Sequence, residues 1–158
     1  MADPFAPLKA DHRKVEGLFS QFEQTNEPDI ARQICDELTV HAMVEEELVY
    51  PLLATKVGHS DSEEARAEHE EAKGLISQIE QGLRSQSDVS SLVKELQQAV
   101  QHHVEEEERE IFPKMMEAVP KLTEVLGPDV EARRAQLVER MDSARDANQP
   151  STVVAQKG

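Results

Sequence analysis

Residues 41–51, HAMVEEELVYP, hold the pattern around which the chain is organised, and HVEEEEREIFP at residues 103–113 repeats it. Aligning the two prolines pairs the histidines and the glutamates four positions after them: His41 with His103, and Glu45 with Glu107. Residues four apart lie one turn apart on the same face of a helix. Each copy therefore predicts a helix that presents an imidazole and a carboxylate together.

A second pair of segments repeats as well, DHRKVEGL at residues 11–18 and EHEEAKGL at residues 68–75. The chain thus consists of a duplicated unit, an acidic–His helix followed by an H-x-x-x-E helix. His12 and His69 lie within the apolar stripes of their helices, as do His41 and His103 in the H-x-x-x-E helices. Together the copies place four histidines and two glutamates at comparable heights in a helical bundle, which outlines a dinuclear metal site.

The composition favours one helical domain. A chain of 158 residues is long enough for a substantial core, and its many Glu, Gln, Ala and Leu residues favour helix over sheet. The spacing of apolar residues predicts long helices near residues 7–24, 29–56, 60–83 and 89–119, with short connections. Four such helices predict an all-α, antiparallel up-down-up-down four-helix bundle. Pro51 and Pro113 are expected to kink or end the regular helix just past each motif.

Beyond Pro120 the pattern weakens, and we expect a short helical extension and a flexible tail. A turn of helix to Leu126, a break at Gly127-Pro128 and one further amphipathic helix near residues 130–143 are predicted. From residue 144 the sequence lacks periodicity, which is typical of a loose tail. We therefore assign residues 1–126 to the four-helix bundle and residues 127–158 to a C-terminal helix and tail.

The net charge and the cysteine content limit the possible binding partners and the cellular compartment. The net charge of −15 would repel nucleic-acid backbones and anionic membranes, so we expect neither as a partner. The single cysteine, Cys35, cannot form an intramolecular disulfide, which fits a reducing interior. No stretch resembles a signal peptide or a membrane span. We expect a cytoplasmic protein.

Burial of the repeated polar residues requires compensation. An uncompensated buried carboxylate would cost several kcal/mol, and bound cations are the simplest remedy for Glu45 and Glu107. Imidazole and carboxylate from facing helices suit iron or manganese, whereas the absence of thiolates disfavours structural zinc and four imidazoles disfavour magnesium and calcium. A metal-free His–Glu hydrogen-bond network, in a helical interaction module, is the alternative.

The pattern His12, H41-x-x-x-E45, His69, H103-x-x-x-E107 resembles the hemerythrin-like, HHE cation-binding family, in particular its bacterial branch. The resemblance covers about residues 8–118. It implies a non-haem di-iron centre with an oxo or hydroxo bridge, with manganese as the second choice of metal. The implied ligands of one iron are His12 and His41, those of the other His69 and His103, with Glu45 and Glu107 bridging.

The chain departs from oxygen-carrying members of that family. They have a further His one turn after the third-helix His, where this chain has Lys73, and an H-x-x-x-x-D pattern in the last motif. Water, Glu16 or Tyr50 could complete the site, the two side chains as an additional ligand or a supporting residue. Glu16 is otherwise a rim acid, and Tyr50 otherwise packs at the end of the bundle. Glu46, Glu108, His59 and His102 are expected to be solvated.

The resemblance implies a protein that meets dioxygen, nitric oxide or peroxide, in sensing or in detoxification under oxidative stress. The alternative is an enzyme whose di-iron centre decomposes peroxide or superoxide, a peroxidase- or catalase-like oxidoreductase. Any signalling or sustained turnover would use a separate partner, such as a redox protein. Ferritin-like storage is disfavoured, because those bundles use E-x-x-H instead of H-x-x-x-E.

Overall fold

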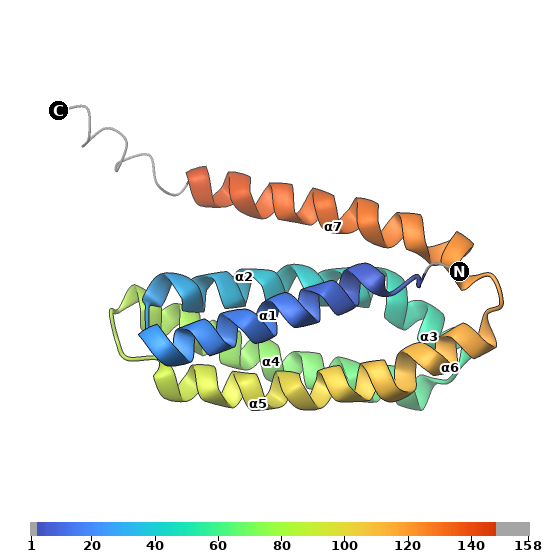
Figure 1. Ribbon diagram of the computed structural model, residues 1–158, viewed down its shortest axis with the longest axis horizontal. Helices are drawn as coiled ribbons and strands as arrows, with labels where there is room; N and C mark the ends of the chain where they lie inside the picture. Colours follow the sequence, from blue (N-terminus) through green and yellow to red (C-terminus); the bar gives the residue numbers. More distant parts are fainter. Residues whose placement is uncertain (1–2, 148–158) are drawn as a thin grey trace.

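The computed structural model describes residues 3–147 and shows helices without strands over that range, which confirms the all-α prediction. Four long helices lie side by side in Figure 1, and consecutive ones run in opposite directions, consistent with the predicted up-down-up-down bundle. They are α1 (Ala6–Thr25), α2 (Pro28–Val44), α4 (His59–Arg84) and α5 (Ser90–Glu106). The remaining elements are η1 (Glu45–Val49), α3 (Tyr50–Lys56), η2 (Glu107–Ile111), α6 (Phe112–Ala118) and α7 (Leu122–Ala147).

Local chemistry sets the helix ends close to where the sequence predicts them. Pro7 and Pro28 lie in the first turns of α1 and α2, where a missing backbone N–H costs nothing. Asn26 ends α1 in the left-handed conformation, with φ 54°, and its N–H donates to the Phe22 carbonyl. The third long helix begins at His59, one residue before the predicted start near residue 60. His59 lies outside the predicted helix but is the first residue of the observed one, and it is exposed, as predicted.

Pro51 and Pro113 each follow a π-helical turn, and neither proline ends its helix. In η1 the Tyr50 N–H donates to the carbonyl of Glu45, five residues back, and in η2 the Phe112 N–H donates to that of Glu107. A proline ring clashes with the carbonyl four residues before it in a regular helix. A widened turn relieves that clash, so each helix continues past its proline with one extra residue in the turn.

The polar repeat separates two apolar clusters. One contains Leu8, Val44, Leu53, Phe112 and Met115, near α3, α6 and the start of α7. The other is built from α1, α2, α4 and α5 residues such as Val15, Ile34, Ile79 and Leu96. On α1, His12 lies between Leu8 of the first cluster and Val15 of the second. Packing on both sides therefore fixes the helices at the level of the polar residues.

The C-terminal prediction needs correction. No break occurs at Gly127-Pro128, and α7 instead runs continuously from Leu122 to Ala147 with Pro128 inside it. Leu126 and Val130, on either side of that proline, are both buried in the same core, which holds the two parts of the helix in line. The boundary that we predicted after residue 126 falls inside α7. The division into two domains at that point stays a prediction. The predicted tail lies outside the described residues from residue 148 onward, whereas residues 144–147 are helical.

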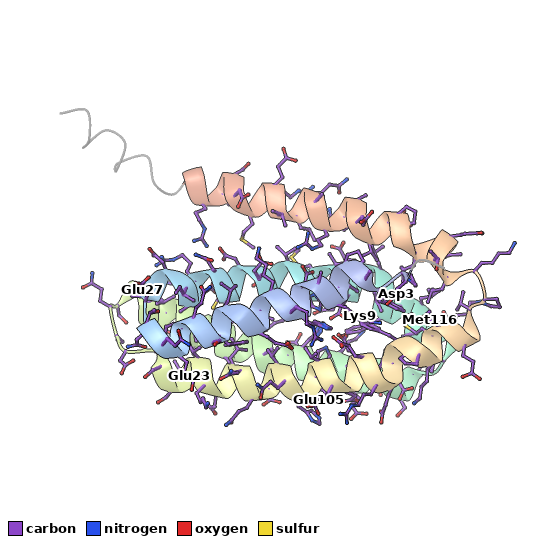
Figure 2. All side chains as sticks on the ribbon, viewed as in Figure 1. Asp3, Lys9, Glu23, Glu27, Glu105 and Met116 are labelled. Carbon is purple, nitrogen blue, oxygen red and sulfur yellow. The ribbon has the colours of Figure 1, made fainter. Side chains whose placement is uncertain are left out.

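Charged side chains cover the outside of the molecule. Figure 2 shows Glu23, Glu27 and Glu105 projecting outward from the bundle, and all three are exposed. Within residues 3–147, no helix combines the length and the apolar character needed to cross a membrane.

Cys35 provides a test of the packing of α2. Its side chain is fully buried, and burial together with the nearby charges of Glu80 and Asp36 raises the pKa of its thiol to about 12. Thiolate is the reactive form of cysteine. We therefore expect Ellman's reagent at pH 8 to leave the native protein unmodified and to react fully after denaturation. Rapid reaction of the native protein would show that this part of the core is open.

Candidate metal centre

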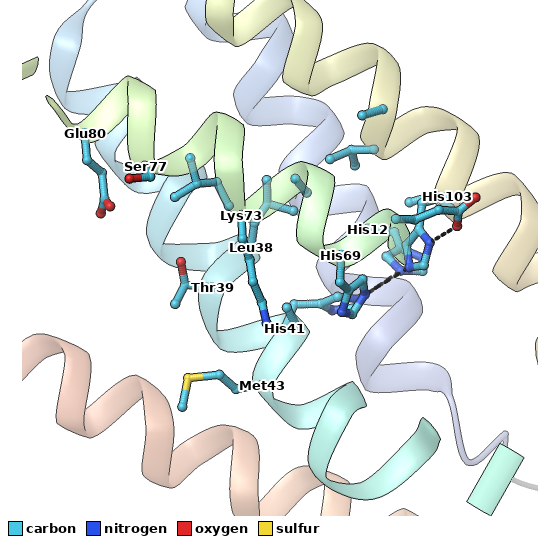
Figure 3. A pocket seen from close by; sticks show the side chains of 17 residues that line it. His12, Leu38, Thr39, His41, Met43, His69, Lys73, Ser77, Glu80 and His103 are labelled. Carbon is cyan, nitrogen blue, oxygen red and sulfur yellow. Dashed lines mark hydrogen bonds and ion pairs between the residues drawn. The ribbon is translucent and has the colours of Figure 1, made fainter. Parts of the chain in front are cut away.

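The four predicted histidines meet in the interior, one each from α1, α2, α4 and α5, and all are buried. Their Nε2 atoms form two pairs: His12 and His41 are 3.1 Å apart, and His69 and His103 are also 3.1 Å apart. Figure 3 shows the four imidazoles gathered at one side of a cavity. The structure thus brings together all four residues that the sequence selected.

The two glutamates join these pairs. Glu45 and Glu107, each the first residue of a π turn, are 0% exposed. Glu45 Oε1 lies 3.2 Å from His41 Nε2 and 3.1 Å from His69 Nε2. Glu107 Oε1 lies 3.2 Å from His12 Nε2, while its Oε2 lies 3.1 Å from His103 Nε2. Each carboxylate therefore contacts one histidine of each pair, as a bridging ligand would.

Two groups of four potential ligand atoms result, and they share the glutamates. The first group, hereafter the first half-site, is His12, His41, Glu45 and Glu107. The second half-site is His69, His103, Glu45 and Glu107. In each group the ligand atoms lie within 4.8 Å of one another. Two cations that share two carboxylates would fit this arrangement.

The other ring nitrogen of every histidine faces a carboxylate. The pairs are His12 Nδ1 with Glu108 Oε2 (2.6 Å), His41 Nδ1 with Asp11 Oδ2 (3.2 Å), His69 Nδ1 with Glu46 Oε2 (2.9 Å) and His103 Nδ1 with Glu68 Oε1 (2.6 Å). An ionised carboxylate can only accept, so each Nδ1–H donates to it. This leaves the Nε2 lone pair of a neutral ring directed at the centre, the tautomer that binds a metal.

These outer carboxylates were missed by sequence reasoning. Glu46 and Glu108 were expected to be solvated, yet they orient His69 and His12. The signal that could have identified them is their position directly after Glu45 and Glu107 in the two copies of the repeat. The other two acids, Asp11 and Glu68, directly precede the first histidine of each copy. The duplication therefore repeats the supporting acids together with the candidate ligands.

Tyr50 enters the second half-site, and a π turn places it there. Its hydroxyl donates to Glu107 Oε2 at 2.8 Å and lies 2.8 Å from His69 Nε2 and 3.1 Å from His103 Nε2. In a regular helix a residue five positions after Glu45 would point well away from it. The π turn spanning Glu45–Val49 instead brings the Tyr50 hydroxyl 3.2 Å from Glu45 Oε1.

The corresponding place in the first half-site is apolar. Phe112, the counterpart of Tyr50 in the repeat, lies parallel to the His12 ring with centroids 6.3 Å apart. Phe5 stacks on Phe112 at 4.0 Å. The two half-sites are therefore alike in histidines and glutamates, but only the second has a hydroxyl among the contacts described.

Other residues considered from the sequence lie outside the cluster. The Glu16 side chain is 41% exposed and pairs with Arg13 instead of approaching the histidines. Lys73 donates to Glu46 Oε1 at 2.8 Å, so it supports an outer carboxylate and does not reach the centre. His102, the neighbour of His103, is exposed as predicted.

The electrostatics of the cluster call for positive charge. Glu45 Oε2 and Glu107 Oε1 are buried without a hydrogen bond, although Glu107 Oε1 lies near His12 Nε2. Burial disfavours the His41 imidazolium, but the charge of Glu45 and the hydrogen bond to Asp11 prevail and raise the pKa of His41 to about 10. Burial also opposes ionisation of Glu45, yet His41 and its other partners hold the pKa of that carboxyl well below its usual value. Protons or metal ions are thus the charges that these residues accommodate, and the donor set fits a metal pair.

A small apolar cavity leads from the surface to the histidines. Its volume is about 200 Å³, and Leu38, Ile76 and Val100 are among the apolar side chains that line it. Figure 3 shows Leu38 between the imidazoles and Ser77, which is exposed. Apolar walls disfavour ions and admit small uncharged molecules.

Comparison with known proteins agrees with this geometry. The family model described as Hemerythrin HHE cation binding domain matches residues 3–115. A protein named DNA nickase from Nostoc sp. is 30% identical over 139 residues, which cover 85% of this chain and 40% of the nickase. An uncharacterized hemerythrin-like protein from Schizosaccharomyces pombe is 30% identical over 110 residues, covering 65% of this chain and 54% of that protein. The chain thus spans about half or less of these curated relatives, and no solved structure matches it significantly.

The raised pKa of His41 predicts how pH affects the metal-free chain. The ordinary pKa of histidine is 6.5, and folding raises that of His41 to about 10. Stabilisation by the imidazolium is therefore complete below pH 6.5 and is lost as pH rises through about 10. Urea unfolding in the presence of a chelator should show stability falling over this range, and less steeply for His41→Gln. Parallel pH profiles for the two chains would contradict the assignment.

Proposed function

Because the chain belongs to the hemerythrin HHE cation-binding family, we propose that its helices form a four-helix bundle around a non-haem di-iron centre with an oxo or hydroxo bridge. The centre would bind or react with dioxygen, nitric oxide or peroxide, for sensing or detoxification. The observation that carries this proposal is the pair of overlapping half-sites, in which two buried glutamates each contact a histidine of both pairs. Manganese is the second choice of metal, since the same donors suit it.

In this proposal each half-site holds one ion. His12 and His41 hold the first, His69 and His103 hold the second, and Glu45 and Glu107 bridge them. Bound iron supplies the change of redox state and the affinity for small oxidants. The outer carboxylates keep each imidazole in the ligating tautomer, a role whose loss commonly lowers metal affinity.

The protein's own groups also shape what reaches the centre. The apolar cavity suits small uncharged ligands such as dioxygen, nitric oxide and hydrogen peroxide. Burial and the charges of Glu107 and Glu45 raise the pKa of Tyr50 well above its usual value, so its hydroxyl keeps its proton at neutral pH in the metal-free chain. That hydroxyl is the group best placed to hydrogen-bond to a ligand in the second half-site, or to serve as a ligand itself.

Peroxide decomposition is the alternative function, and Tyr50 is the observation that favours it. Two molecules of hydrogen peroxide give one of dioxygen and two of water, so that one is oxidised and the other reduced without an external electron donor. A positioned proton donor near the reacting oxygen helps such a step. Reduction of other oxidants, superoxide among them, would use electrons from a separate redox partner. The single buried thiol suits a reducing compartment, and we propose the cytoplasm.

DNA nicking is not extended to this chain. The named nickase is more than twice as long as the region it shares with this protein. The net charge of −15 would oppose binding to a phosphate backbone. We therefore propose small ligands, and neither nucleic acid nor membrane, as the partners of this bundle.

Adjacent histidines on α5 allow a matched test of the centre. His103 is buried in the second half-site, whereas His102 is exposed. After reconstitution with Fe(II), iron analysis should give about two ions per chain for the wild type and for His102→Ala, and about one for His103→Ala. A near-ultraviolet charge-transfer band of an oxo-bridged pair should accompany full loading. Equal iron content in the two variants, or no binding by the wild type, would overturn the proposal.

Tyr50→Phe separates ligand binding from turnover. Phe112 occupies the equivalent place in the repeat, so a phenylalanine ring should fit, and iron content should stay unchanged. If the Tyr50 hydroxyl supplies a proton, peroxide consumption should fall by about 100-fold or more. Stable nitric oxide adducts with negligible peroxide consumption by the wild type would favour sensing. Turnover that is unaffected by the substitution would remove Tyr50 from the reaction.

A further inference from the structure

Arg134 connects the C-terminal helix α7 to the centre. Its Nε lies 2.9 Å from Asp11 Oδ1 and 3.0 Å from Asp11 Oδ2, and its Nη2 lies 2.6 Å from Oδ1. The Asp11 side chain is only 4% exposed. A two-pronged guanidinium–carboxylate contact of this kind fixes the orientation of the carboxylate as well as its charge.

The same carboxylate holds a candidate ligand. Asp11 Oδ2 accepts from His41 Nδ1 at 3.2 Å, so Arg134, Asp11 and His41 form one chain of hydrogen bonds that ends in the first half-site. Burial alone would raise the pKa of Asp11, but the hydrogen bonds from His41 and Arg134 prevail and lower it. Asp11 therefore stays ionised and holds the ligating nitrogen of His41 toward the centre.

The equivalent carboxylate of the second copy has a different environment. Glu68 accepts from His103 Nδ1, and its other oxygen lies 3.4 Å from the exposed His102. Among the described contacts of Glu68 there is no arginine and no residue of α7. The described contact between α7 and a carboxylate that orients a histidine is therefore confined to the first half-site, although the histidines of both copies have an acid at Nδ1.

We infer that Arg134 is a positioning residue for His41, and that docking of α7 and occupancy of the first half-site are linked. This inference rests on the proposed metal centre. Arg134 belongs to a helix beyond residues 3–115, which the family model matches. If docked α7 holds His41 in its ligating orientation, α7 raises the affinity for the metal. Linkage then requires that metal binding strengthen the docking of α7 by the same factor.

Arg133 supplies the matched control. It is the neighbouring residue on α7 and pairs with Glu47 at 2.6 Å, outside the histidine cluster. Arg133→Gln and Arg134→Gln each remove one cation and one ion pair from α7. We expect Arg134→Gln to lower the affinity for one of the two ions by about 10–100-fold, while Arg133→Gln leaves both affinities near wild type. Arg134→Lys, which keeps the charge but loses the two-pronged contact, should fall between them.

Two further readouts do not depend on activity. In the wild type, cleavage of α7 by trypsin should slow when Fe(II) or Mn(II) is added, and the slowing should be smaller in Arg134→Gln than in Arg133→Gln. In the metal-free chains, imidazole nitrogen NMR should show the hydrogen-bonded Nδ1 signal of His41 disturbed by Arg134→Gln alone. Circular dichroism of each variant confirms that the helices remain folded.

The outcomes separate this inference from the proposed function. If the wild type binds metal and the two glutamine variants have equal metal affinities and equal rates of proteolysis, the proposed linkage is wrong. The proposed metal centre is unaffected by that result. If the wild type binds no metal, the proposed function and the linkage both fail. The NMR comparison then still decides whether Arg134 positions His41, because an unchanged His41 signal in Arg134→Gln would reject that role as well.

Discussion

The constraint on which the rest of the structure depends is the burial of Glu45 and Glu107. Two fully buried carboxylates within 3.2 Å of imidazole nitrogens require positive charge between them, since the interior cannot solvate them as water does. The surrounding residues favour a positive charge between the two histidine pairs. Four further carboxylates accept from the outer nitrogens of the histidines, so that in a neutral ring the inner nitrogen is the one with the lone pair. The long helices supply the two apolar clusters that lie on either side of this arrangement.

The sequence predicted the helices and the inner ring of residues because both follow from short spacings. Apolar periodicity located the four long helices to within a few residues, and the two H-x-x-x-E motifs selected four of the side chains that converge. The repeated acidic–His segments selected the other two, His12 and His69. The outer carboxylates escaped prediction because their partners come from other helices. Glu46 binds His69 and Glu108 binds His12, contacts between copies that no local pattern specifies. The role of Tyr50 was ambiguous because an ideal α-helix would point its side chain away from Glu45, whereas the π turn points it toward Glu45.

The C-terminal helix shows how packing overrides a local signal. A Gly-Pro pair normally interrupts a helix, yet Leu126 and Val130 are buried in one core and α7 continues through Pro128.

Duplication explains why the two half-sites resemble each other, and the departures from it distinguish them. Tyr50 replaces a phenylalanine in one half, and Arg134 reaches the other through Asp11. The duplication provides the candidate ligands, while these single contacts give each half-site its own surroundings.

The π turns at Glu45–Val49 and Glu107–Ile111 limit how far this protein can be engineered for heat resistance. Replacing the following proline so that the same residues wind as a regular α-helix would remove the irregularity, a common route to a higher melting temperature. In the first turn the same change would rotate everything downstream by about 100° and carry the phenol away from the glutamate. The irregular turns are therefore a fixed feature of any thermostable version that is meant to keep its chemistry.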